Sequence, residues 1–107
     1  MTREEVLQLV REFHERLSAI YGQRLKGVYL YGSYARGEAD EDSDIDVAVV
    51  LAGPVDRVEE RWRVNDLASE LSLREDCLLS CFFLSEAEFE ATPYAVHRSI
   101  VREGVAV

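Results

Sequence analysis

Two aspartates stand at the start of an apolar run in the middle of the chain. They are Asp44 and Asp46 in Ser43-Asp44-Ile45-Asp46, and the run Val47 to Leu51 follows directly. Successive side chains of a strand point to opposite faces, so both carboxylates are expected on one face, about 6–7 Å apart. At that separation they repel by about 2–3 kcal/mol at an effective dielectric constant near 20. A fold that keeps them together needs a nearby cation or a proton on one carboxylate, and such oxygen ligands suit Mg²⁺ and its phosphate partners.

A turn suited to binding phosphate precedes the aspartates. Gly32 and Ser33 follow the β-type run Val28 to Tyr31, and Arg36 comes three residues after Ser33. Glycine permits a positive φ or a close backbone approach, and serine offers a hydroxyl and an amide where unpaired N–H groups attract an anion. Alone, a Gly-Ser turn is usually an ordinary connection, and an Asp-x-Asp pair is usually solvated surface. Together, at this spacing and between two strands, they favour a nucleotide site.

The elements that must position this site follow from the hydrophobic periodicity. Apolar residues at three- and four-residue steps predict an amphipathic helix from Thr2 to Tyr21, capped by Thr2 with Glu5 and ended by Gly22. We expect strands over Leu25–Tyr31 and Asp44–Leu51, the second apolar on both faces and therefore central. The loop Gly32–Asp42 between them has room for one helical turn after Ser33.

The second half of the chain predicts a helix, a strand and two further helices. The ranges are Val55–Leu73, Cys77–Leu84, a short helix capped by Ser85 with Glu88 that ends before Pro93, and Pro93–Glu103, capped by Thr92-Pro93 and stopped at Gly104. The predicted fold is a single α/β (α+β) domain over residues 1–107. It has a small mixed three-stranded sheet, to which Val105–Val107 could add an edge strand, and helices packed mainly on one side.

Composition narrows the functional classes. Twelve Lys and Arg against 21 Asp and Glu give a net charge of −9, which argues against broad nucleic-acid binding because that requires clustered cations. The charged N-terminus lacks a signal-peptide core, and no apolar stretch is long enough for a bilayer. Cys77 and Cys81 would lie about 13 Å apart in a strand, so we expect buried free thiols and a cytoplasmic location.

The segment GSYARGEADEDSDIDVAVVL resembles the signature of the minimal nucleotidyltransferases of the DNA polymerase beta superfamily. The matching features are Gly32-Ser33, then Ala35-Arg36-Gly37, then Ser43 to Asp46 before the apolar run. The resemblance covers about 20 residues, and the predicted order of elements is compatible with it. It implies a nucleotidyltransferase fold, phosphates held at Gly32 and Ser33 with Arg36 nearby, and two catalytic Mg²⁺ ions on Asp44 and Asp46. The reaction would be attack of an acceptor hydroxyl on the α-phosphate of ATP or another NTP, with release of pyrophosphate.

One part of the family pattern is not clearly present. The resemblance implies a third carboxylate on the next strand, acting as metal ligand and general base. Asp76 could supply it, or the corresponding position could be Ser80, which neither accepts a proton near pH 7 nor binds Mg²⁺ strongly. Tyr34, beside the Gly-Ser turn, is the better candidate for stacking on a base, whereas Tyr31 is more simply a strand-end core residue.

The chain is therefore expected to be a nucleotidyltransferase or a degenerate relative. The family resemblance extends to antitoxins paired with helical HEPN toxins, and implies AMP transfer to a toxin tyrosine. The alternative is a nucleotide-binding protein that neutralises its partner by complex formation. The short, acidic chain argues against a general RNA or DNA polymerase, which must hold a template. Exposed apolar surface on the second or last long helix could serve a homodimer.

The remaining polar residues favour ordinary roles. We expect Asp40, Glu41 and Asp42 to form a solvated loop, and His14 and His97 to be surface or packing residues. Trp62 is expected in the core or at a partner interface.

Overall fold

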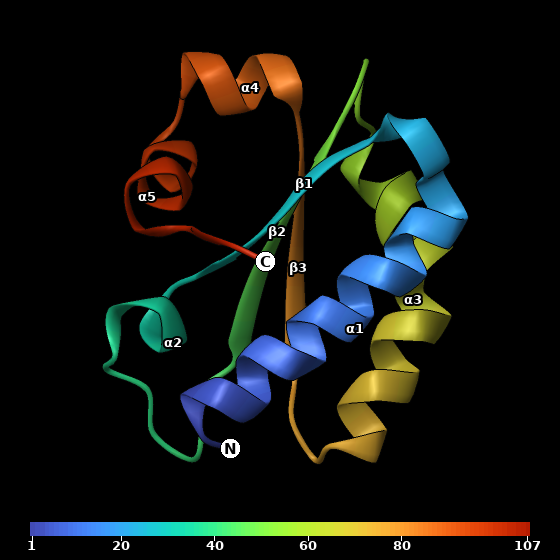
Figure 1. Ribbon diagram of the computed structural model, residues 1–107. Coiled ribbons are helices and arrows are strands. Elements are labelled where there is room, and N and C mark those ends of the chain that lie inside the picture. The colour runs from blue at the N-terminus through green and yellow to red at the C-terminus, as the bar shows by residue number, and fades with distance from the viewer.

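A computed structural model describes all residues, 1–107, and builds them around a four-stranded sheet with strand order β3-β2-β1-β4 (Figure 1). β1 pairs antiparallel with β2 and β4, whereas β3 runs parallel to β2. The elements are α1 (Arg3–Tyr21), a 3₁₀ turn (Gly22–Arg24), β1 (Leu25–Tyr31), α2 (Ser33–Arg36), β2 (Ile45–Leu51), α3 (Arg57–Arg74), β3 (Leu79–Ser85), α4 (Glu86–Ala91), α5 (Ala95–Glu103) and β4 (Val105–Ala106). The predicted mixed sheet is confirmed, with Val105–Ala106 as its edge strand.

The two long helices, α1 and α3, cover one face of the sheet (Figure 1). The Thr2 and Glu5 capping box begins α1, and Gly22 follows its last residue, both as predicted. Alternate residues of β2, from Ile45 to Leu51, point into the core beneath these helices. None of the helices is both long and apolar enough to cross a bilayer.

The opposite face of the sheet is covered by the chain's last helices. Ile100 of α5 is buried against Ala48 and Val50 of β2 and Leu84 of β3. Tyr29 of β1 stacks on Phe89 of α4, with ring centroids 5.0 Å apart. This second, smaller core explains why β2 is apolar on both faces.

His97 of α5 is fully buried, and neither of its ring nitrogens has a hydrogen-bond partner. Its ring lies between Phe82 and Tyr94, and its Nε2 is 3.8 Å from the Glu88 carboxylate. The packing role expected for this residue is confirmed.

Three predicted boundaries are wrong for local reasons. The second long helix begins at Arg57 rather than Val55, because the Asp56 side chain caps it by accepting bonds from the amides of Val58 and Glu59. Thr92 does not cap the last helix: it adopts a left-handed conformation with φ +47° and ends α4, its amide donating to the carbonyl of Glu88. The last helix instead begins at Ala95, after Tyr94. The third strand begins at Leu79 rather than Cys77, because the Cys77 amide still donates to Ser72 at the end of α3. Cys77 and Cys81 are free thiols, as expected, but both are half-buried rather than buried.

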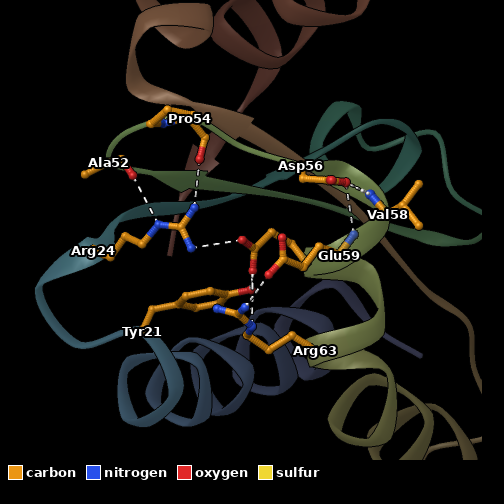
Figure 2. A network of polar contacts seen from close by, with 9 residues as sticks. Tyr21, Arg24, Ala52, Pro54, Asp56, Val58, Glu59 and Arg63 are labelled. Atoms are coloured by element: carbon orange, nitrogen blue, oxygen red, sulfur yellow. Dashed lines mark hydrogen bonds and ion pairs between the residues drawn. The ribbon is translucent and has the colours of Figure 1, made fainter.

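A buried carboxylate ties α1, α3 and the end of β2 together, at the end of β2 far from Asp46 (Figure 2). Glu60 is 2% exposed, and it accepts bonds from the Tyr21 hydroxyl and from Nη1 of Arg24, each at 2.9 Å. Arg24 also donates to the carbonyls of Ala52 and Pro54. Burial and the Glu60 carboxylate raise the pKa of Tyr21 above its usual range.

Replacing Arg24 by methionine should lower the free energy of unfolding by about 2 kcal/mol, because Glu60 would keep its charge in the core with less compensation. Arg16→Met is the matched control, since the Arg16–Glu70 pair is exposed and should contribute under about 1 kcal/mol. Urea unfolding of both variants checks the difference. Equal losses would show that Glu60 is compensated without Arg24.

Candidate nucleotide-binding site

The candidate site lies where β1 ends and β2 begins. Asp46 is in register with Tyr31 on β1 and with Ser80 on β3. Paired residues of neighbouring strands share a face, so these three side chains lie abreast on the face that carries α5. Asp44 is exposed and precedes β2, whereas Ile45 between the two aspartates is buried in the core of the opposite face.

The electrostatics of this site favour a cation. Burial, followed by the charge of Asp44, raises the pKa of Asp46, while Arg36 partly offsets this. Burial and the Asp46 carboxylate raise the pKa of Tyr31 to about 12. The negative charge on Asp46 is therefore poorly compensated by the protein alone.

The donor set fits Mg²⁺ shared with phosphates rather than a metal held by protein alone. Mg²⁺ is commonly bound through one or two carboxylates, with phosphate oxygens and water completing the coordination. Asp44 and Asp46 provide two such carboxylates, and no group of three or more His, Cys, Asp or Glu residues is placed to hold a metal.

Gly32 brings the turn into contact with the acidic pair. It adopts φ +75°, and a Cβ at this position would collide with Oδ2 of Asp46. Ser33 then begins the single helical turn α2, which ends at Gly37 in the left-handed conformation. The first amides of a helix have no partner within it, so the turn presents N–H groups beside the carboxylates.

Gly32→Ala should lower the free energy of unfolding by about 2 kcal/mol or more, through an unfavourable φ and the collision with Asp46. Gly37→Ala provides the control: its φ is +76° but nothing lies within 4 Å of an added Cβ, so it should cost only about 1 kcal/mol. Urea unfolding compares the stability of the two variants, and titration with a fluorescent ATP analogue compares their nucleotide affinity. If Gly32→Ala and Gly37→Ala lost the same stability and the same nucleotide affinity, the collision with Asp46 would be refuted.

Arg36 lies near the site but is held by carboxylates. Its guanidinium donates to Glu38 and, across the fold, to Glu103 of α5, each at 3.0 Å. These bonds raise the pKa of Arg36. The Nη2 group of Arg36 has no partner in the chain, so Arg36 can contact a phosphate through Nη2 or by giving up one of these carboxylates.

Two predicted site residues are not brought to the acidic pair. Tyr34 is 7% exposed and packs in the core beneath α1 and α3, on the other face from Asp46. Its ring is thus not presented to a nucleotide. Asp76 lies in the loop before β3 with φ +50°, and Ser80 occupies the position beside Asp46. Of the two candidates for the third position, Ser80 is the one in register.

Two other neighbours were not predicted as site residues. Tyr31 was assigned to the core, yet its pKa responds to Asp46. Its place opposite the first residues of the second strand could have signalled this. The contact between Glu103 and Arg36 could not be predicted from the sequence, because the two residues are 67 positions apart. In the loop, Asp40 bonds Ser43 and the amide of Asp42, which supports an ordinary structural role.

A mixed sheet with a Gly-Ser turn set against a carboxylate pair defines the nucleotidyltransferase class. The family model for the nucleotidyltransferase domain matches residues 10–106. The chain therefore belongs to the nucleotidyltransferase domain family, which confirms both the resemblance and the enzyme class expected from the sequence.

The sequence is similar to two proteins of Methanocaldococcus jannaschii. It is 38% identical over 76 residues to "Putative protein adenylyltransferase MJ0141", covering 71% of this chain and 76% of that protein. It is 35% identical over 96 residues to "Putative protein adenylyltransferase MJ0604", covering 89% of this chain and 90% of that protein.

Solved structures share the fold. A "putative nucleotidyltransferase" from Sulfolobus solfataricus has a TM-score of 0.72 at 23% identity, covering 97% of this chain and 80% of that one. A chain of a toxin–antitoxin structure with AMP-PNP has a TM-score of 0.61 at 24% identity, covering 99% of this chain and 72% of that one. A chain of the complex of tri-AMPylated Shewanella oneidensis HEPN toxin with MNT antitoxin has a TM-score of 0.50 at 24% identity, covering 97% of this chain and 66% of that one.

Proposed function

We propose that this protein binds ATP with Mg²⁺ at the Gly32-Ser33 turn and transfers AMP to a hydroxyl group. The observation that carries the proposal is the contact between Gly32 and Asp46, because it joins a phosphate turn to a carboxylate pair. Asp44 and Asp46 would hold Mg²⁺, and the amides and hydroxyl of Ser33 would bind phosphate oxygens. When bound, Mg²⁺ neutralises charge on the phosphates and favours departure of pyrophosphate.

The reaction is a single displacement at the α-phosphorus. The acceptor oxygen forms a bond to phosphorus, the bond to the bridging oxygen of the β-phosphate breaks, and pyrophosphate leaves with that electron pair. The acceptor proton needs a base, and Ser80, beside Asp46, is not one at neutral pH. The proton would pass to solvent or to the acceptor protein, while this chain contributes mostly positioning and charge.

We propose a protein acceptor, a tyrosine of a HEPN-type toxin, with this chain as the antitoxin. Support comes from the relatives named as protein adenylyltransferases and from the fold shared with the MNT antitoxin bound to a tri-AMPylated HEPN toxin. The net charge of −9 would suit a partner with a basic surface. Free Cys77 and Cys81 are consistent with a reducing cytoplasm.

A second function is favoured by one observation, the serine at position 80. Without a third carboxylate at this position of β3, the protein would bind a nucleotide but transfer it poorly. It would then neutralise its partner by complex formation alone.

The two functions are separated by incubation with α-³²P-labelled NTPs and Mg²⁺, with and without the product of the neighbouring gene as the candidate partner. Transfer of label from ATP to that protein, lost in Asp44→Asn, supports the enzyme. A stable complex without transfer from any nucleotide, in the wild type as in Asp44→Asn, supports the binding protein. Absence of both transfer and complex would contradict the antitoxin assignment.

A further inference from the structure

A groove of about 600 Å³ runs between α3 and the outer edge of the sheet. β3 forms that edge, because its only strand partner is β2. The helix side of the groove is lined by Arg61, Asn65, Ser69 and Ser72, at near-helical spacing, and its far end by Asp76.

The backbone of β3 is open along this groove. The Leu79 amide donates to Oγ of Ser72 on α3, which shows that its N–H points outward. Backbone groups alternate between the two edges of a strand, so the N–H and C=O groups of Cys81 and Phe83 face the same open edge. Unpaired edges of this kind readily pair with another strand.

The two ends of the groove carry opposite charges. Arg61 lies at one end and Asp76 at the other, both are exposed, and neither forms an ion pair or a side-chain hydrogen bond within the chain. Arg61 is the exception among the arginines of α3, since Arg57, Arg63 and Arg74 are paired with Glu88, Glu59 and Glu12.

Exposed apolar side chains accompany both charges. Trp62 and Val58, 76% and 68% exposed, adjoin Arg61 around a second hollow that shares Arg61 and Asn65 with the groove. Leu73 and Leu78, 83% and 56% exposed, lie beside Asp76. Each end therefore combines one unpaired charge with two exposed apolar side chains.

We propose that this surface binds a second copy of the same chain across a two-fold axis. A two-fold axis runs the two grooves antiparallel, so Arg61 of each copy meets Asp76 of the other. The same operation packs Trp62 and Val58 of one copy against Leu73 and Leu78 of the other, and places the β3 edges antiparallel. The self-complementary placement of charge is what favours a second copy over an unrelated partner, and it does not depend on the nucleotidyl-transfer reaction.

Light scattering after size exclusion, at concentrations up to about 100 µM, should show a dimer that dissociates on dilution with a micromolar constant. Trp62 is the only tryptophan, so its emission should shift to longer wavelength as the dimer dissociates. Trp62→Ser should weaken the dimer about thirtyfold, whereas Val101→Ser, at an exposed position of α5, should leave it unchanged.

Charge reversal tests the orientation. Arg61→Glu should raise the dissociation constant about tenfold by placing two acidic groups together, and Arg61→Glu with Asp76→Arg should restore most of the affinity. Asp76→Asn should weaken the dimer with little backbone strain, since asparagine tolerates the positive φ found there. Arg98→Glu, at an exposed position of α5, controls for the change in net charge. Thermal melts monitored by circular dichroism confirm that each variant folds.

A wild-type protein that stays monomeric throughout this range, with constant Trp62 emission, would overturn the proposal. A dimer that withstands Arg61→Glu and Trp62→Ser in folded protein would also overturn it, because its interface would lie elsewhere. Failure of the double reversal to restore a dimer lost in Arg61→Glu would refute the antiparallel orientation.

Discussion

Asp46→Asn should reduce nucleotidyl transfer by about 10³-fold or more and, in the absence of metal, should make the protein more stable at neutral pH. The loss follows from removing a metal-binding carboxylate from a reaction whose transition state depends on charge stabilisation worth several kcal/mol. The gain follows from the environment of Asp46, where burial and the charge of Asp44 raise the pKa.

The pH dependence of that gain has a defined sign. A carboxyl whose pKa is higher in the folded than in the unfolded protein binds its proton more tightly when folded, so ionising it costs stability as the pH rises. The stability advantage of Asp46→Asn should therefore be largest at neutral pH and shrink as acidification protonates Asp46 in the wild type.

Thermal melts from pH 4 to pH 7.5, with and without Mg²⁺ and a non-hydrolysable ATP analogue, check this prediction. Mg²⁺ with the analogue should raise the melting temperature of the wild type more than that of Asp46→Asn. Asp66→Asn, at an exposed position of α3, is a control for removal of one carboxylate. A variant that is less stable than the wild type at neutral pH without metal would contradict the electrostatic description of the site.

Ser80→Asp should increase nucleotidyl transfer by about 10²-fold. Position 80 is in register with Asp46 on the adjacent parallel strand, so an aspartate there would place a third carboxylate beside the pair. A positioned general base typically contributes 10²–10⁴-fold. The same substitution should destabilise the metal-free protein, because three carboxylates would then repel one another.

Ser80→Asn is the matched control, since it has the shape of aspartate without its charge or basicity. Initial rates of label transfer and melts at several Mg²⁺ concentrations compare the three proteins. An unchanged rate in Ser80→Asp, despite stronger stabilisation by Mg²⁺, would show that the base is supplied from elsewhere. Equal rates and equal Mg²⁺ responses in both variants would show that position 80 does not reach the metal site.

Much of the fold could be predicted because its signals are local. The Thr2–Glu5 and Ser85–Glu88 capping boxes and the stop at Gly22 each depend on residues a few positions apart. The start of α5 could not be predicted in this way, although the end of α4 before Pro93 was. Thr92 precedes a proline, which suggests a helix start, but the structure uses it in a left-handed conformation to end the preceding helix.

The site residues also differ in whether their relation depends on nearby or on distant positions in the sequence. Gly32, Ser33, Asp44 and Asp46 come from one strand–turn–strand segment, and their spacing carries their relation. Ser80 reaches Asp46 only after the crossover through α3, and the register depends on where the bonds to Ser72 end that helix. Tyr34 packs in the core, and its carbonyl accepts a bond from Nε of Arg3 on α1, which is 31 residues away in the sequence.

The ion pair between Arg36 and Glu103 links the turn to the last helix. If a bound phosphate draws Arg36 away from Glu103, then ordering of α5 and binding of the nucleotide oppose each other. Thermodynamic linkage makes that opposition reciprocal: any contact that holds Glu103 on Arg36 weakens nucleotide binding by the factor with which the nucleotide weakens that contact. In that case the C-terminal helix would be a point from which occupancy of the turn is sensed and adjusted.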